Sequence, residues 1–576
     1  MMQHFQGLPA SSGVAIGPAW RYLPARIEID GRVVTDADAE WQRLQAAIAC
    51  TRAQLQELET RAGAKVGEEE AAIFAAHQLF LDDPDLETLL EQAICQEHQN
   101  AAAAVQDAFE HYAQILAALD DPYLQARAAD VRDVSQRLLR NLQGAEETPA
   151  QLSGPAIILA EDLTPSDTMQ FERSKILGLC TLRGGPTSHT AILARALGVP
   201  AVVAAPLPLT EIADGTTVIL DGDSGQVIID PEPETLIAAQ HRLAVWQNVH
   251  DTQVLAAKNP AITRDGHAIE VVANIGGVED AQQALAAGAE GVGLFRTEFL
   301  YLDRTTMPDE AEQIVLYRQV FDLMAGRPVV VRTLDIGGDK PAPYLDVAPE
   351  PNPFLGWRAI RMNTERPDVL KSQFRALLIA AEASNADLRI MLPLVSNLFE
   401  VQLARALYEE VRQSLRQEGY RLSQPVQFGM MVEVPAAALL ADHFASLVDF
   451  FSIGTNDLTQ YALAVDRTNE RVADLASPYH PAVLKLIAMT IAAAHEQGKW
   501  VGLCGELAGA PLAAPLLLGL GLDEFSMAPA AIPEVKARIR ECSLAEGQDL
   551  AVRALALGSS DEVISLLEAF VNRRDL

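Results

Sequence analysis

Short apolar runs alternate with longer helical patterns along the C-terminal half of the chain. From Ile262 onward, eight strand-like cores follow one another, and helical segments lie between them. The cores are residues 271–274, 291–295, 329–332, 389–394, 428–432, 450–453, 500–503 and 524–527. Eight strand–helix units over about 300 residues are typical of a (β/α)8 barrel. We therefore predict such a barrel over residues 261–576.

Two other patterns fill the N-terminal half. Residues 36–144 have an almost purely helical pattern, and breaks at residues 63–67, 82–84 and 120–122 predict about four antiparallel helices. Short apolar strands precede and follow this block. We therefore predict a small α/β domain, residues 1–35 and 145–232, with the helical block inserted into it. A long polar helical pattern predicts a linker over residues 233–260. The predicted fold class is multidomain α/β, with an inserted helical bundle and a C-terminal (β/α)8 barrel.

The charge of the chain restricts its partners. The 576 residues include 78 acidic and 44 basic ones, a formal net charge of −34. Such a surface repels phosphate backbones, which argues against nucleic-acid or anionic-membrane partners and favours a small basic protein partner. No run of 18 or more uncharged apolar residues and no signal-peptide pattern occurs, so no membrane insertion is expected. Five scattered cysteines indicate a reducing, cytoplasmic location without a disulfide framework.

The segment R-G-G-P-T-S-H-T-A-I-L-A-R at residues 183–195 is the strongest candidate for chemistry in the N-terminal half. It places His189 after a glycine pair and the N-cap types Thr187 and Ser188, at the start of a helical pattern. A helix N-terminus stabilises an anion, so the site suits a histidine that accepts a phosphoryl group. The alternative is a capped helix with an incidental surface histidine.

Polar side chains follow the predicted barrel strands, at the ends where barrel enzymes carry their active sites. Several arginines suit phosphate and carboxylate oxygens, and Glu433 and Asp457 suit Mg²⁺. Cys504 is either a small buried residue or, beside a metal and arginines, a proton donor to a carbanion. The full set is Asn274, Arg296, Thr297, Glu298, Arg332, Asp335, Lys340, Arg358, Glu433, Asn456, Asp457, Arg467, Cys504 and Glu506.

Long motifs follow one another along essentially the whole chain. They include G-L-P-A-S-S-G-V-A-I-G-P-A from Gly7, G-G-P-T-S-H-T-A-I-L-A-R from Gly184, R-T-L-D-I-G-G-D-K from Arg332, M-V-E-V-P-A-A-A from Met431, F-F-S-I-G-T-N-D-L-T-Q-Y from Phe450 and G-L-C-G-E-L-A-G from Gly502. Together they resemble Enzyme I of the bacterial phosphoenolpyruvate:sugar phosphotransferase system. Pro186 departs from the family pattern, which often has a polar or charged residue there.

The resemblance implies a phosphotransferase that moves the phosphoryl group of phosphoenolpyruvate to Nε2 of His189 and then to the phosphocarrier HPr, with release of pyruvate. It implies that Cys504 protonates the enolate and that Glu433 and Asp457 hold Mg²⁺. It implies HPr docking on residues 36–144, a homodimer formed by the barrel, and a hydrogen bond from Thr168 to the histidine ring. The implied phosphoenolpyruvate-binding residues are Arg296, Arg332, Arg358, Asn456, Asp457 and Arg467.

Because one histidine must meet two partners, we predict that the α/β domain swivels, with hinges near residues 144–155 and 230–233. Three alternatives fit less well. Pyruvate phosphate dikinase and phosphoenolpyruvate synthase need an ATP-binding domain, whereas a helical pattern precedes the α/β unit here. The nitrogen-related Enzyme I paralogue normally adds an N-terminal sensor domain. The intact set of Cys504, Glu433, Asp457 and arginines argues against an inactive phosphorelay scaffold.

Overall fold

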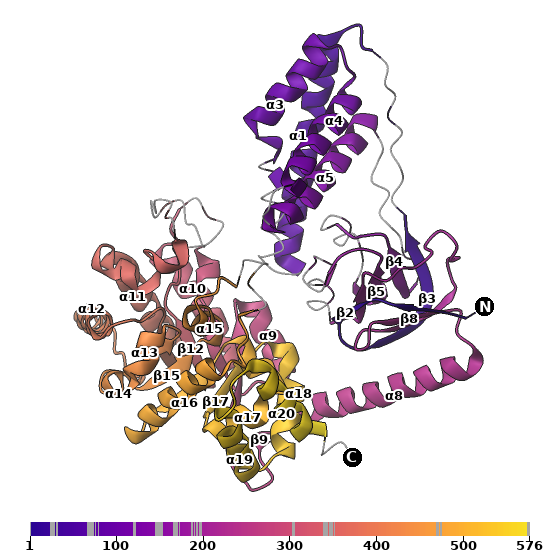
Figure 1. Cartoon of the computed structure of the whole chain (residues 1–576). Helices are drawn as coiled ribbons and strands as arrows, with labels where there is room; N and C mark the ends of the chain where they lie inside the picture. The colour runs from indigo at the N-terminus through magenta and orange to yellow at the C-terminus, as the bar shows by residue number, and fades with distance from the viewer. Residues whose placement is uncertain are drawn as a thin grey trace. The chain divides into compact units, whose positions relative to one another are not determined.

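The computed structural model describes residues 2–23, 33–65, 80–118, 122–144, 154–164, 173–185, 198–301, 306–337, 352–467 and 475–572, together with isolated positions between these ranges. The chain divides into two compact units, Met1–Gln247 and Asn248–Leu576. Strands and helices occur in both units (Figure 1).

An eight-stranded mixed sheet forms the α/β part of the N-terminal unit, in the order β1-β8-β7-β3-β4-β5-β6-β2. Its strands are β1 (Gln3–Gln6), β2 (Leu8–Ser11), β3 (Val14–Tyr22), β4 (Ala156–Ala160), β5 (Ile176–Thr181), β6 (Ala201–Val203), β7 (Thr217–Asp221) and β8 (Gln226–Ile229). Strands β3 and β4 are parallel neighbours, with Tyr22 opposite Ala160. The chain therefore leaves the sheet after β3, forms the helical block and returns to the adjacent position.

Four described α-helices make up the helical block: α1 (Ala37–Lys65), α3 (Pro84–Glu91), α4 (Ala101–Ala118) and α5 (Pro122–Gln143). The predicted breaks are confirmed where α3 and α5 begin, each at a proline. The break predicted at residues 63–67 does not occur at Gly63, because α1 continues to Lys65, and Gly67 lies outside the described residues. A π-helical turn at Gln92–Gln96 was not predicted, because none of its residues is a helix breaker.

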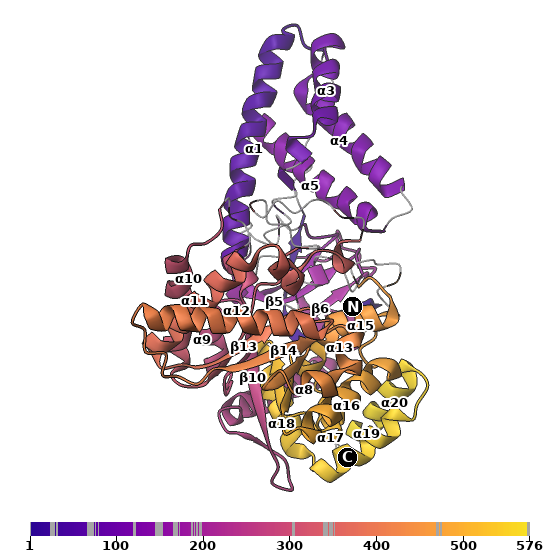
Figure 2. The same cartoon turned by 90° about the vertical axis from the view of Figure 1, so that its left-hand side faces the viewer.

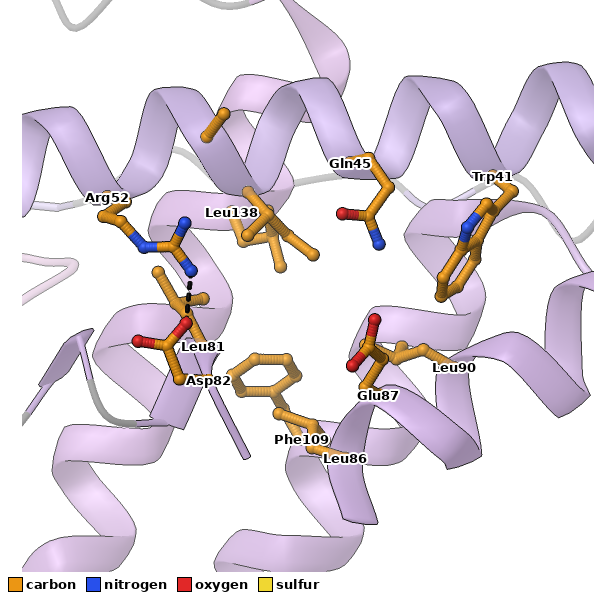
Figure 3. Close-up of a pocket in the computed structure, with 12 residues that line it drawn as sticks. Trp41, Gln45, Arg52, Leu81, Asp82, Leu86, Glu87, Leu90, Phe109 and Leu138 are labelled. Atoms are coloured by element: carbon orange, nitrogen blue, oxygen red, sulfur yellow. Dashed lines mark hydrogen bonds and ion pairs between the residues drawn. The ribbon is translucent and has the colours of Figure 1, made fainter. Parts of the chain in front are cut away.

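A cavity of about 220 Å³ lies within this helical block (Figure 3). Apolar side chains such as Phe109 of α4 form part of its wall. At one end Arg52 pairs with Asp82, and Gln45 of α1 lies across the cavity from Glu87 of α3. None of the residues lining this cavity belongs to the predicted catalytic or substrate-binding set.

Eight parallel strands form a closed barrel in the C-terminal unit (Figure 2). Strand β10 pairs with both β17 and β11, which closes the sheet. The strands are β10 (Ala268–Ile275), β11 (Val292–Arg296), β12 (Pro328–Arg332), β13 (Asp387–Leu392), β14 (Gln427–Val432), β15 (Phe450–Ile453), β16 (Trp500–Leu503) and β17 (Glu524–Met527). Each predicted strand core overlaps one of them, which confirms the predicted barrel. A short strand, β9 (Ala261–Ile262), pairs antiparallel with β10.

Helices surround the barrel strands and pack on them in one continuous core that includes Phe295, Phe374 and Phe451. They are α9 (Val278–Ala286), α10 (Glu310–Met324), α11 (Pro367–Ser384), α12 (Leu398–Gln417), α13 (Pro435–Leu439), α14 (Ala441–Phe444), α15 (Thr455–Leu463), α16 (Pro481–Glu496), α17 (Ala514–Leu520), α18 (Ile532–Glu541), α19 (Leu544–Leu555) and α20 (Ser560–Asn572). A further helix, α8 (Pro233–Ala256), precedes the barrel. Among the described helices, none is long and apolar enough to cross a membrane.

Buried ionisable side chains lie at the end of the barrel where the strands begin. Glu524, on β17, is 1% exposed. Nη1 of Arg389 lies 3.7 Å from an oxygen of Glu524 and 3.7 Å from an oxygen of Glu270, and its guanidinium stacks on Trp500. Within the described part of the chain, neither carboxylate oxygen of Glu524 has a hydrogen-bond partner. Burial raises the pKa of Glu524 to about 8.

Candidate active site

Five of the predicted site residues of the C-terminal unit stand at or just after the ends of barrel strands, whereas Arg358 and Arg467 lie further along the chain after β12 and α15. Arg296 is the last residue of β11 and Arg332 the last of β12. Glu433 follows β14, Cys504 follows β16, and Asp457 lies in the first turn of α15 after β15. Because all eight strands are parallel, these positions meet at one mouth of the barrel.

Asp335 joins two of the predicted arginines at this mouth. Its carboxylate accepts hydrogen bonds from Nε of Arg358 at 2.7 Å and from Nη2 at 2.9 Å, and lies 3.3 Å from Nη2 of Arg332. Arg332 also pairs with the buried carboxylate of Glu298. Asp335 is fully buried, and Arg358 is only 2% exposed. Removing one partner of such a buried pair leaves an uncompensated charge, so the network holds both guanidinium groups in place.

Both arginines keep their charge despite burial. Burial lowers the pKa of the Arg332 and Arg358 guanidinium groups, but the neighbouring carboxylates outweigh it and raise both above the ordinary arginine value. Nη2 of Arg358 also lies 3.7 Å from Oδ2 of Asp457, and Nη2 of the exposed Arg467 lies 3.9 Å from Oδ1 of Asp457. The structure thus brings two of the predicted arginines, Arg358 and Arg467, to one carboxylate, Asp457.

Glu433 and Asp457 are the two residues predicted to hold a metal ion. Oε1 of Glu433 accepts the backbone N–H of Leu394 at 2.5 Å. The buried Oδ1 of Asp457 has no hydrogen-bond partner within the described part of the chain. Burial and the carboxylates of Asp457 and Asp335 raise the pKa of Glu433, and a cation would relieve this repulsion.

These two carboxylates fit one kind of metal site. Mg²⁺ is often held by one or two carboxylates, with substrate oxygens and water completing the shell. Among the described residues, no group of three or more His, Cys, Asp or Glu side chains is placed to hold a metal ion. The donor set therefore suits an ion shared with an oxygen-rich substrate rather than a closed, all-protein site.

Cys504 is 3% exposed, next to the arginine network. Its backbone N–H donates to the carbonyl oxygen of Ile453 at 3.0 Å, and its Sγ lies 3.8 Å from the same oxygen. Burial raises the pKa of the Cys504 thiol to about 11. The thiol therefore keeps its proton at neutral pH, so burial and proton donation are compatible in this side chain.

Three candidates from the sequence had been given no specific role, and the structure shows that they orient other site residues: Glu298, Asp335 and Glu506. Nδ2 of Asn456 donates to Oε1 of Glu506 at 3.1 Å, and the backbone N–H of Glu506 donates to Oδ1 of Asn456 at 3.0 Å. In R-T-L-D, Asp335 follows Arg332 by three residues, and this spacing could have indicated from the sequence that the two side chains pair. The pairing of Glu298 with Arg332 spans 34 residues and leaves no local pattern.

The structure describes part of the sequence around the predicted phosphoryl acceptor. Oγ of Ser188 accepts a hydrogen bond from the backbone N–H of Ala191 at 3.4 Å, the contact made by an N-cap. Gly184 has a φ of +95°, a conformation that favours glycine. The glycine turn and the cap at Ser188 are therefore present. The predicted residues that lie outside the described ones are Thr168, Pro186, Thr187, His189 and Lys340.

Comparison with known proteins places the chain in a family. Three models of phosphoenolpyruvate-utilising enzymes match it, the N-terminal region over residues 6–127, the mobile domain over 152–225 and the phosphoenolpyruvate-binding domain over 251–544. A phosphoenolpyruvate-protein phosphotransferase of Geobacillus stearothermophilus is 46% identical over 563 residues, 98% of this chain and 97% of the relative. That of Bacillus subtilis (strain 168) is 42% identical over 568 residues, covering 98% and 99%. The NMR solution structure of an Enzyme I protein (nEIt) is 34% identical, covers 42% of this chain and 99% of its own, and has a TM-score of 0.37.

The three domains match in this order along the chain, and the region matched by the last one folds as the closed barrel. Together they define a phosphoenolpyruvate-utilising enzyme. Relatives of one name match the chain over nearly its full length. The chain belongs to the phosphoenolpyruvate-protein phosphotransferase family, as the motifs had predicted.

Proposed function

We propose that this enzyme transfers the phosphoryl group of phosphoenolpyruvate to Nε2 of its own His189 and then to a histidine of HPr, releasing pyruvate, as the first step of sugar uptake. Family membership establishes phosphotransfer from phosphoenolpyruvate to a protein; the residues and the carrier belong to the proposal. The buried network of Arg332, Asp335 and Arg358 at the barrel mouth supports it most directly.

Phosphoenolpyruvate is a compact polyanion, and the mouth offers fixed positive charge to bind it. The guanidinium groups of Arg332 and Arg358 are held in place by buried carboxylates, so they are preorganised for an anionic substrate. Arg296, Asn456 and Arg467 complete the proposed binding set, with Asn456 oriented by its paired hydrogen bonds to the next loop. A site with preorganised cations stabilises charge on the transferring group without the cost of reorienting solvent.

Glu433 and Asp457 are the proposed Mg²⁺ ligands. When bound, the ion would neutralise charge on substrate oxygens as a Lewis acid. Asp457 also lies 3.7 Å from Arg358 and therefore links the proposed metal site to the anion-binding arginines.

The transfer step forms a bond between phosphorus and Nε2 of His189 and breaks the bond between phosphorus and the enol oxygen. The enolate that leaves takes a proton at carbon from the Sγ–H of Cys504 and becomes pyruvate. The raised pKa of Cys504 keeps this proton available until the carbanion forms. The thiolate is then reprotonated from solvent.

HPr is the proposed second partner and docks on the helical block. Helix α3 carries Asp85 and Glu87 in its first turn, and Asp82 and Asp83 precede it, which suits a basic protein surface. Homodimerisation through the barrel and a cytoplasmic location are also part of the proposal. They rest on the resemblance and on the cysteine usage.

The proposal is tested by labelling the protein with radioactive phosphoenolpyruvate and Mg²⁺. His189→Ala should take up no label, whereas the control His443→Ala, at an exposed histidine of α14, should be labelled like the original protein. Acid-labile, base-stable label should pass to HPr. Label retained by His189→Ala, or label that never reaches HPr, would contradict the proposed acceptor or the proposed carrier, respectively.

A further inference from the structure

The cavity of about 220 Å³ in the helical block has an apolar floor and one helical wall (Figure 3). The wall is a single face of α1, since its lining positions 41, 45, 48, 49 and 52 follow the helical period. The floor consists of buried apolar side chains from three helices: Leu86 and Leu90 of α3, Phe109 of α4 and Leu138 of α5. A dry apolar cavity of about 150 Å³ can hold a benzene molecule. The space therefore suits a six-membered ring that carries a short chain.

Three polar side chains converge at one end of this cavity. Figure 3 shows the side-chain ends of Gln45 and Glu87 pointing toward one another, with the indole of Trp41 at the same end. Within the described part of the chain, no hydrogen bond or ion pair engages any of these three side chains. At the other end, by contrast, Arg52 pairs with Asp82, so its charge is already balanced. The uncompensated charge that faces the cavity is therefore the carboxylate of Glu87.

We propose that this cavity binds a small primary amine with an apolar ring. The ammonium group donates hydrogen bonds to the carboxylate of Glu87 and to the amide oxygen of Gln45, and the indole of Trp41 attracts the same positive charge. The ring packs on the apolar floor, where the burial of its surface supplies most of the affinity. Anions are disfavoured, because Arg52 is already paired and the whole chain has a net charge of −34. The inference does not depend on the proposed function.

Three compounds of nearly the same shape test the chemistry of the ligand. Phenethylamine is a cation, phenethyl alcohol is neutral and phenylacetate is an anion, and each carries one benzene ring. Isothermal titration calorimetry of the full chain at neutral pH should give phenethylamine a dissociation constant on the order of 0.1–1 mM, as expected for a ligand of its size. Phenethyl alcohol should bind about fivefold more weakly, because it lacks the charge that pairs with Glu87. Phenylacetate should not bind measurably.

Two variants test the location of the site. Ala49 lines the cavity from an exposed position of α1, and Ala49→Leu keeps a strong helix former there while its longer side chain takes up free space. This variant should lose measurable binding of phenethylamine, because the ring and the leucine cannot share the cavity. Glu87→Gln keeps the shape of the side chain but removes its charge. It should therefore bind phenethylamine about fivefold more weakly and phenethyl alcohol as the original protein does.

The matched control is Glu57→Gln, which removes an exposed carboxylate of α1 outside the cavity lining. It should bind phenethylamine like the original protein, which separates the site from the general attraction of an acidic surface for cations. Thermal unfolding followed by circular dichroism checks that each variant is folded. Equal affinity for phenethylamine and phenethyl alcohol, undiminished binding by Ala49→Leu, equal losses in Glu87→Gln and Glu57→Gln, or no measurable binding to the original protein would overturn the inference. None of these measurements requires phosphotransfer, so failure of the proposed function would leave them unaffected.

Discussion

Replacing Asp335 by asparagine should weaken both the barrel and its substrate site. Asp335 is fully buried and pairs with Arg358 through hydrogen bonds of 2.7 and 2.9 Å and with Arg332 at 3.3 Å. Asp335→Asn keeps the shape but removes the negative charge, so two buried guanidinium groups lose their shared partner. Breaking a buried ion pair from one side costs about 3–5 kcal/mol. For a unit of this length, that corresponds to a fall in melting temperature of roughly 4–7 °C.

Differential scanning calorimetry measures the melting temperature of the barrel. Steady-state pyruvate release measures the KM for phosphoenolpyruvate. This KM should rise at least about tenfold, because the arginines are no longer held in place. Asp368→Asn is the matched control, because it removes an exposed Arg–Asp pair in the same unit, worth at most about 1 kcal/mol. A melting temperature within about 1 °C of the original, together with an unchanged KM, would refute the view that this network positions the arginines.

Two further predictions concern the other end of the barrel and the thiol. The pKa of Glu524 is raised from 4.5 to about 8, so the stability it contributes is present below pH 4.5 and is lost as the pH rises toward 8. In urea titrations, the unfolding free energy of the original protein should fall between pH 5 and 8, and Glu524→Gln should remove up to roughly 4 kcal/mol of this fall. If the unfolding free energy of the variant falls with pH as steeply as that of the original, the prediction is wrong. Cys504→Ala should lower pyruvate release about 10²- to 10⁴-fold while labelling from phosphorylated HPr persists, and undiminished release would rule out the thiol as proton donor.

The barrel could be predicted because each of its strands is a short apolar run with a helix pattern on either side. Strand β12, for example, is the run P-V-V-V-R, and its arginine marks the end at the mouth. The bounds and types of the helices in the helical block were harder to predict from the sequence. The π-helical turn at Gln92–Gln96 consists of ordinary helix-forming residues, and α1 passes through Gly63 because one glycine costs a long helix only about 1 kcal/mol.

The site could be predicted as a set of strand ends but not as a network. Strand order alone places Arg332 and Glu433 at one mouth, since parallel strands share their C-terminal side. Which carboxylate holds which arginine depends on loop paths and side-chain rotamers. The surroundings of the buried Glu524 could not be predicted either, because Arg389 lies 135 residues away in the sequence and no local pattern relates the two positions.

The chain leaves the sheet after β3 and returns to it at β4, the paired neighbour of β3, and this insertion makes the helical block exchangeable. The points where the chain leaves β3 and enters β4 lie on neighbouring strands, about one strand length apart. A module that leaves and re-enters a scaffold at nearby points can be replaced without disturbing the hydrogen bonds of that scaffold. In the proposed function, the helical block recognises the carrier and the rest of the chain handles the phosphate, so a chimera carrying a relative's block should accept that relative's carrier.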